Sequence, residues 1–121
     1  MRVVIVGGGI AGLGAALLLT RAGHAVRVLE RDAMARPPSP VEAFEKWRRP
    51  GAPQVRHSHA FLARLRNLLR ERIPDLLEAL HEAGAEDLPL ASLLPPELDD
   101  RRPRPGDEEL TMLGCRRLTF E

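Results

Sequence analysis

A glycine-rich turn between an apolar run and a helical pattern constrains this chain more than any other feature. Residues 2–6 form a β-branched apolar run, which is typical of a strand buried on both faces of a parallel sheet. Gly7, Gly9 and Gly12 follow with the spacing G-x-G-x-x-G, and a helical pattern then extends over about residues 11–22. The sequence therefore predicts a strand, a tight turn and a helix at the start of the chain.

Each glycine of this turn has its own steric role. Gly7 permits the tight turn, Gly9 lets the backbone approach a pyrophosphate without a Cβ in the way, and Gly12 lets the helix lie close to the strand. Residues 25–29 are predicted as a second strand, and Glu30 follows at its carboxyl end, where a carboxylate can accept both ribose hydroxyls of an adenosine. The pattern favours dinucleotide binding, with phosphates on the free N–H groups of the helix N-terminus. The alternative is a glycine-rich turn in an ordinary βα unit.

Length, net charge and cysteine content narrow the kinds of protein that this chain can be. A chain of 121 residues has room for one small domain, and its net charge of +1 gives no drive toward nucleic acid. The single cysteine, Cys115, excludes an internal disulfide and fits a reducing compartment. Glycines interrupt the apolar N-terminus, so we expect neither a signal peptide nor a membrane span, and we expect a cytoplasmic protein.

Downstream of the glycine turn, helical patterns alternate with proline-rich and polar stretches. Residues 33–56 are predicted as a Pro-rich loop, residues 57–84 as a helical pair divided at Pro74, and residues 85–121 as a loop with the start of a next element. Within these segments we predict a short helix at 41–48, helices at 59–73 and 75–83, strands within 85–94 and at 109–115, and a helical start from residue 116.

The stretch from Pro53 to His59 gathers polar side chains just before the predicted helical pair. Its amide, guanidinium and two imidazoles would hydrogen-bond a bound cofactor at the mouth of its cleft. Alternatively, Ser58 caps a helix and the histidines lie on the surface. The H-x-H spacing could suggest a metal, but no third ligand is near and Cys115 is distant in sequence, so we predict no metal site. The candidate side chains here are Gln54, Arg56, His57 and His59.

Three of these stretches also carry a family resemblance. Residues 3–13, residues 23–31 and residues 53–59 resemble the N-terminal segment of FAD-dependent monooxygenases of the p-hydroxybenzoate hydroxylase type. The resemblance implies FAD with its ADP half over the turn, formed by Gly7, Gly8, Gly9, Ile10, Ala11 and Gly12. It also implies Glu30 on the adenosine ribose, and it places Arg56 or its neighbours near the phosphates. Arg117 is similar to a family arginine that lies beside the cofactor. From the residues alone, Arg31 either reaches the adenosine side or is a solvated loop charge.

In enzymes of this kind, reduced flavin activates oxygen to hydroxylate or epoxidise a small organic substrate, and NAD(P)H commonly supplies the electrons. The resemblance covers only the first part of a typical family member, and the substrate would be bound by the later part. No catalytic side chain is predicted in these residues, so we expect the segment alone to be inactive.

The sequence thus predicts an α/β fold: an incomplete Rossmann-like FAD-binding βαβ unit over residues 1–32, followed by helices and an irregular C-terminal segment. We interpret residues 1–121 as a partial FAD/NAD(P)-binding domain of a flavin-dependent oxidoreductase. Two alternatives stay open at this point. One is a non-catalytic remnant or nucleotide-binding module, and the other is an NAD-binding dehydrogenase domain.

Overall fold

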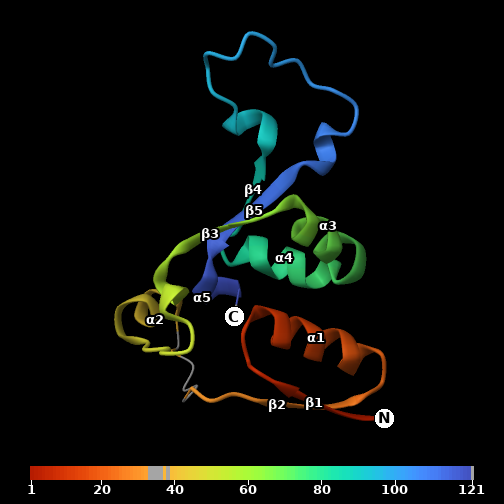
Figure 1. Ribbon diagram of the computed structural model, residues 1–121, viewed down its shortest axis with the longest axis vertical. Coiled ribbons are helices and arrows are strands. Elements are labelled where there is room, and N and C mark those ends of the chain that lie inside the picture. Colours follow the sequence, from red (N-terminus) through yellow and green to blue (C-terminus); the bar gives the residue numbers. More distant parts are fainter. Residues whose placement is uncertain (33–36, 38, 121) are drawn as a thin grey trace. The chain divides into compact units, whose positions relative to one another are not determined.

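The structure is a computed structural model that describes residues 1–32, 37 and 39–120 (Figure 1). These residues fall into two units. The first unit contains Met1–Arg56 and, from the end of the chain, Phe120. The second unit contains His57–Thr119. Among the described residues, no helix has the length and apolar character needed to cross a bilayer.

The first unit begins with the predicted βαβ arrangement. β1 (Arg2–Val6) leads through the glycine turn into α1 (Ile10–Arg21), and β2 (Ala25–Leu29) follows. The two strands are parallel and in register from the pair Arg2↔Ala25 to the pair Val6↔Leu29. Both strands have the bounds that the sequence predicts, and α1 lies along them in Figure 1. The α/β fold class is therefore confirmed.

The strand pair is covered on one face only. Along β1 exposed and half-buried residues alternate, so that Val4 is 59% exposed and Val6 is 85% exposed. β2 shows the same alternation, with Leu29 49% exposed. The apolar run is typical of a strand that is buried on both faces, but two strands and a few helices are expected to leave strand faces uncovered, and these exposures agree with that expectation. The reason is that β1 is followed by a single helix before β2, and one helix covers one face of a sheet.

The Pro-rich stretch contains a short helix and a 3₁₀ turn. α2 (Pro40–Lys46) begins at Ser39, whose Oγ accepts a hydrogen bond from the Glu42 N–H at 3.1 Å. Proline at the first helical position suits this start, because its missing N–H would have no partner there. The 3₁₀ turn η1 spans Pro53–Arg56 and buries Val55. The predicted short helix at 41–48 is thus confirmed, although it begins one residue earlier and ends two residues earlier.

The second unit is built on a three-stranded antiparallel sheet in the order β3-β5-β4. Its strands are β3 (Ser58–Phe61), β4 (Glu86–Pro89) and β5 (Thr111–Arg116). The prediction of a helix from residue 59 is wrong, because His59 and Phe61 pair with Cys115 and Leu113 of β5. Helix capping by Ser58 is wrong for the same reason.

Two helices follow β3: the first packs against the central strand of the sheet, and the second packs against the first. They are α3 (Ala63–Arg72) and α4 (Pro74–Glu82), and Leu113 of β5 is completely buried. Ile73 separates the helices with φ −144° and ψ 57°, outside the helical region that proline disfavours for the residue before it. Leu69 and Ile73 are buried, whereas Leu62, which precedes α3, is 71% exposed.

A long connection joins β4 to β5. It contains the 3₁₀ turns η2 (Leu90–Leu93) and η3 (Asp107–Glu109), and α5 (Arg117–Phe120) follows β5. Arg70 of α3 forms an ion pair with Glu109 at 2.8 Å, which fixes the end of this connection. Asp87 of β4 accepts hydrogen bonds from Arg66 and His81, and the Arg66 guanidinium chiefly lowers the pKa of that carboxyl.

Candidate nucleotide-binding site

Two glycines shape the turn between β1 and α1. Gly7 has φ +106°, in the left-handed region that L side chains rarely adopt, and its N–H donates to the Leu29 carbonyl at 2.7 Å. A Cβ on Gly12 would lie 1.9 Å from the Gly7 carbonyl oxygen and 3.4 Å from Ile5 Cγ2. The turn and the close approach of helix to strand are therefore present, and both depend on glycine.

The N-terminus of α1 is suited to an anion. Gly9 is the N-cap residue with an extended backbone, and among the described residues no side chain caps the helix there. The first turn, which starts with Ile10 and Ala11, carries no acidic residue. The first N–H groups of a helix have no partner within it and lie at the positive end of its dipole. A phosphate placed here would accept hydrogen bonds from them.

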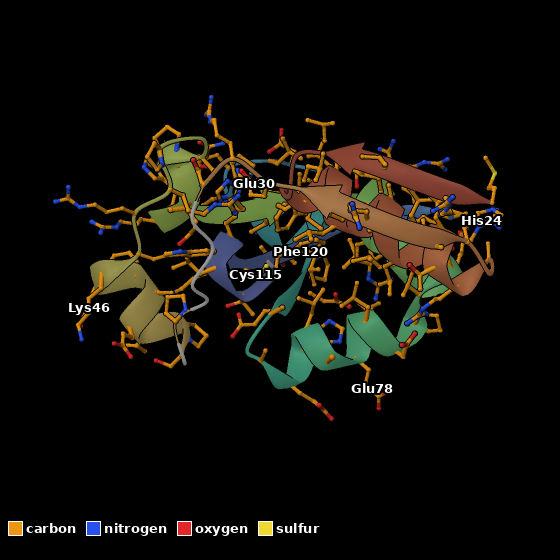
Figure 2. All side chains as sticks on the ribbon, turned by 90° about the horizontal axis from the view of Figure 1, so that it is seen from below. His24, Glu30, Lys46, Glu78, Cys115 and Phe120 are labelled. Atoms are coloured by element: carbon orange, nitrogen blue, oxygen red, sulfur yellow. The ribbon has the colours of Figure 1, made fainter. Side chains whose placement is uncertain are left out.

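Backbone N–H groups hold the Glu30 carboxylate beside this turn. Its Oε2 accepts a hydrogen bond from the Gly8 N–H at 2.6 Å, and its Oε1 accepts one from the Asp32 N–H at 2.9 Å. These two bonds, that of Asp32 first, lower the pKa of Glu30 below its ordinary value. Figure 2 shows Glu30 at the carboxyl end of β2, at the opposite end of the strand from His24. The carboxylate is thus ionised and fixed beside the turn.

Arg49 completes this cluster, and sequence reasoning missed it. Its side chain is only 2% exposed, and its Nη2 lies 3.4 Å from Glu30 Oε2. Its Nε lies 3.9 Å from Asp32 Oδ2, and its guanidinium stacks over the Trp47 ring at 5.2 Å from the centroid. The Gly51 N–H donates to the same Asp32 oxygen at 2.9 Å. A buried guanidinium between two carboxylates ties the Pro-rich stretch to the end of β2.

The residues around Arg49 in the sequence give little indication that its side chain is buried. It follows Arg48, which is exposed, and both stand in a proline-rich stretch of no clear period. Its acidic partners Glu30 and Asp32 lie 19 and 17 residues earlier in the chain. The only usable hint is the Pro50-Gly51 pair directly after it, which marks a turn able to return the chain to β2.

The other predicted residues of the first unit, Arg31, Gln54 and Arg56, are exposed. The Arg31 side chain is 83% exposed and its Nε is 4.0 Å from Asp32 Oδ1. Gln54 is exposed on η1. Arg56 is exposed as well, and its Nη2 donates to the Glu45 carbonyl at 3.1 Å. In this structure Arg56 therefore anchors the end of α2, and its role at phosphates stays a prediction.

Three predicted residues belong to the second unit. His57 is exposed, and its carbonyl oxygen lies 2.8 Å from Nδ1 of His59. The His59 ring stacks on Phe61 with centroids 5.7 Å apart. Arg117 is half-buried at the start of α5. Their contact with a cofactor stays a prediction.

The H-x-H pair and the cysteine are closer than the sequence suggests. His59 and Cys115 stand opposite each other in the β3–β5 pair, although 56 residues separate them in the chain. Even so, the part of the chain that the structure describes holds no group of three or more His, Cys, Asp or Glu side chains that could bind a metal ion.

Cys115 is expected to be a poor nucleophile. The residue is 8% exposed, and burial raises the pKa of its thiol to about 11, so the thiolate is scarce at neutral pH. With a disulfide reagent at pH 8, we expect labelling at least about tenfold slower in the native chain than in urea. Equal rates in both conditions would show that the thiol is accessible and contradict its position in the core.

Comparison with known proteins agrees with the arrangement of the first unit. The family model described as pyridine nucleotide-disulphide oxidoreductase matches residues 1–84. The matched residues include the glycine turn, Glu30 and Arg49, and they end at Gly84 after α4. A comparison with curated proteins gives no match.

Proposed function

Because the chain belongs to the pyridine nucleotide-disulphide oxidoreductase family, we propose that its first unit binds the ADP half of FAD as part of a flavin-dependent oxidoreductase. One observation carries the proposal. An ionised carboxylate, Glu30, is fixed by backbone N–H groups beside a helix N-terminus that no side chain of the described residues caps. The carboxylate suits the ribose of ADP, and the helix N-terminus suits its pyrophosphate.

Each polar part of ADP would have a partner in the first unit. The ribose hydroxyls would donate to Glu30, which already points its oxygens toward Gly8 and Asp32. The pyrophosphate would accept from the N–H groups at the start of α1, over Gly9, Ile10 and Ala11. A Cβ on Gly8 would lie 3.1 Å from Glu30 Oε2, so glycine leaves the space that this carboxylate needs.

The buried guanidinium of Arg49 would act through Glu30. Its Nη2 lies 3.4 Å from the carboxylate, and its side chain has almost no exposure. A cation so placed keeps the carboxylate charged and limits the directions in which it can turn. We therefore assign Arg49 as a positioning residue for the ribose acceptor. Arg31, Gln54 and Arg56 remain proposed contacts at the edge of the site, as do His57, His59 and Arg117 of the second unit.

The redox chemistry would belong to the flavin, which exchanges electrons with a nicotinamide or with oxygen when bound. The residues of this chain would bind and orient it. Residues 1–121 supply one cysteine, Cys115, so a dithiol pair is not formed from these residues alone. The finer proposal, a monooxygenase that uses NAD(P)H and oxygen on a small organic substrate, is supported by the resemblance over residues 3–13, 23–31 and 53–59 taken together.

The proposal is tested by titrating the purified chain with FAD, ADP and NAD. We expect FAD to bind with a saturable flavin signal and ADP to displace it. Tighter binding of NAD than of FAD would instead favour the NAD-binding dehydrogenase domain. If a folded chain binds none of the three, the proposed cofactor site is wrong. A chain that binds a nucleotide but neither carries flavin nor oxidises NAD(P)H would favour the non-catalytic alternative.

A further inference from the structure

A pocket of about 260 Å³ lies in the connection between β4 and β5, and its lining residues are all different from those of the nucleotide-binding proposal. Its apolar lining comes from four leucines: Leu90, Leu94, Leu98 and Leu110. Three of them keep large exposed fractions, 41% at Leu90, 46% at Leu98 and 44% at Leu110. The leucines thus form an apolar lining that stays open to solvent rather than a closed core.

Arginines line the same pocket. Arg101, Arg102 and Arg104 all contribute to it, together with Asp100 and Asp107. Counted as formal charges, three cations and two carboxylates leave one positive charge in excess. A small ligand with one negative charge would balance it.

One carboxylate organises two of these guanidinium groups. Arg102 donates from Nε to Asp100 Oδ1 at 3.0 Å and from Nη2 to Oδ2 at 3.2 Å. Arg104 Nη2 donates to the same Oδ2 at 3.2 Å. These bonds lower the pKa of Asp100, that from Arg102 most, so it stays ionised at neutral pH. The side chains of Arg102 and Arg104 remain 87% and 73% exposed, which leaves their other N–H groups open to a ligand.

The remaining polar groups are used within the connection. Arg101 Nη2 donates to the Leu94 carbonyl at 3.2 Å, which holds this arginine against the apolar lining. Asp107 Oδ2 accepts the Arg104 N–H at 2.8 Å and closes the turn before η3. Asp107 is therefore engaged with the backbone, and Asp100 is the carboxylate that faces the guanidinium groups.

We propose that this pocket binds a small amphipathic monocarboxylate, with its apolar chain among the leucines and its carboxylate on the guanidinium groups. A guanidinium presents parallel N–H donors that match a carboxylate. At about 260 Å³ the pocket is smaller than a typical site for a drug-sized ligand, which suits a short aliphatic chain. The pocket shares no lining residue with the proposed nucleotide site, and this proposal does not depend on that site.

The test is a titration of the 121-residue chain with octanoate, followed by calorimetry and backbone amide shifts. Octanol has the same chain without charge, and octylamine carries the opposite charge. We expect octanoate to bind at least about tenfold more tightly than octylamine, because the arginines repel an ammonium group. We also expect butyrate to bind more weakly than octanoate, since it covers less of the leucine lining.

Two variants separate the head group from the chain. Arg102→Gln should weaken octanoate binding about three- to tenfold, whereas Arg72→Gln, an equal loss of charge on exposed α3, should leave it unchanged. Leu98→Asn should weaken it as well, and circular dichroism would confirm that each variant is folded. The proposal is overturned if a folded chain binds no octanoate at millimolar concentration. Equal binding of octanoate and octylamine, or equal effects of the two arginine variants, would overturn it too.

Discussion

A methyl group added at Gly12 is expected to destabilise the first unit by about 1–3 kcal/mol and to remove its affinity for FAD. The new Cβ would lie 1.9 Å from the Gly7 carbonyl oxygen. This oxygen is a backbone atom, and the backbone also fixes the position of the Cβ. No side-chain rotation relieves such a contact, so α1 must move away from β1. The helix N-terminus then no longer faces the turn, and the proposed phosphate site is lost with it.

Gly14 provides a matched control on the same helix. A Cβ there has nothing within 4 Å. Gly14→Ala should therefore stabilise the chain slightly, by about 0.5–1 kcal/mol, because glycine in a helix interior is less favourable than alanine. Urea unfolding followed by circular dichroism would compare the two variants. If Gly12→Ala and Gly14→Ala are equally stable, the close packing of α1 on the turn is wrong.

Replacing Glu30 by alanine is expected to lower the affinity for FAD by about ten- to a hundredfold. The ribose would lose its charged acceptor, while β2 should persist because Glu30 follows the end of the strand. Glu78→Gln removes one exposed carboxylate from α4 and should leave affinity unchanged. Gly9→Val should abolish binding, because a branched side chain would stand where the pyrophosphate approaches. FAD binding by Glu30→Ala as tight as by the parent would refute the ribose assignment.

The same residue predicts how binding depends on pH. Backbone N–H groups lower the pKa of Glu30, so its charge and its contribution to binding are complete above the ordinary carboxyl range. They are lost only as the pH falls through that lowered pKa. We therefore expect FAD affinity to stay flat from neutral pH down to about pH 5. An affinity that falls already between pH 7 and pH 6 would mean that another group controls binding.

Sequence reasoning succeeded where structure is set by neighbouring residues. Strands β1 and β2, the turn at Gly7 and the break at Pro74 follow from local steric rules, and the structure shows all of them. It failed where pairing joins distant residues. His59 to Phe61 continue the apolar pattern of α3, yet they form a strand because β5, some 50 residues later, supplies its hydrogen-bond partners.

The candidate site likewise contains residues that the local sequence predicts and one that it does not. The glycines and Glu30 could be placed from their spacing, since the turn and the end of β2 are separated by one helix. Arg49 could not, because its burial depends on two carboxylates far back in the chain and on the ring of Trp47. A long-range ion pair leaves no periodic pattern in the sequence.

The central claim, that the first unit binds the ADP half of a flavin, is tested most directly by titrating the chain with ADP and following its backbone amide signals. We expect saturable shifts at Gly8, Ile10 and Ala11, where the phosphates and ribose would lie. We also expect a shift of the indole N–H of Trp47, the single tryptophan, whose ring lies under Arg49. Shifts that are absent, or that fall only on residues of the second unit, would contradict it.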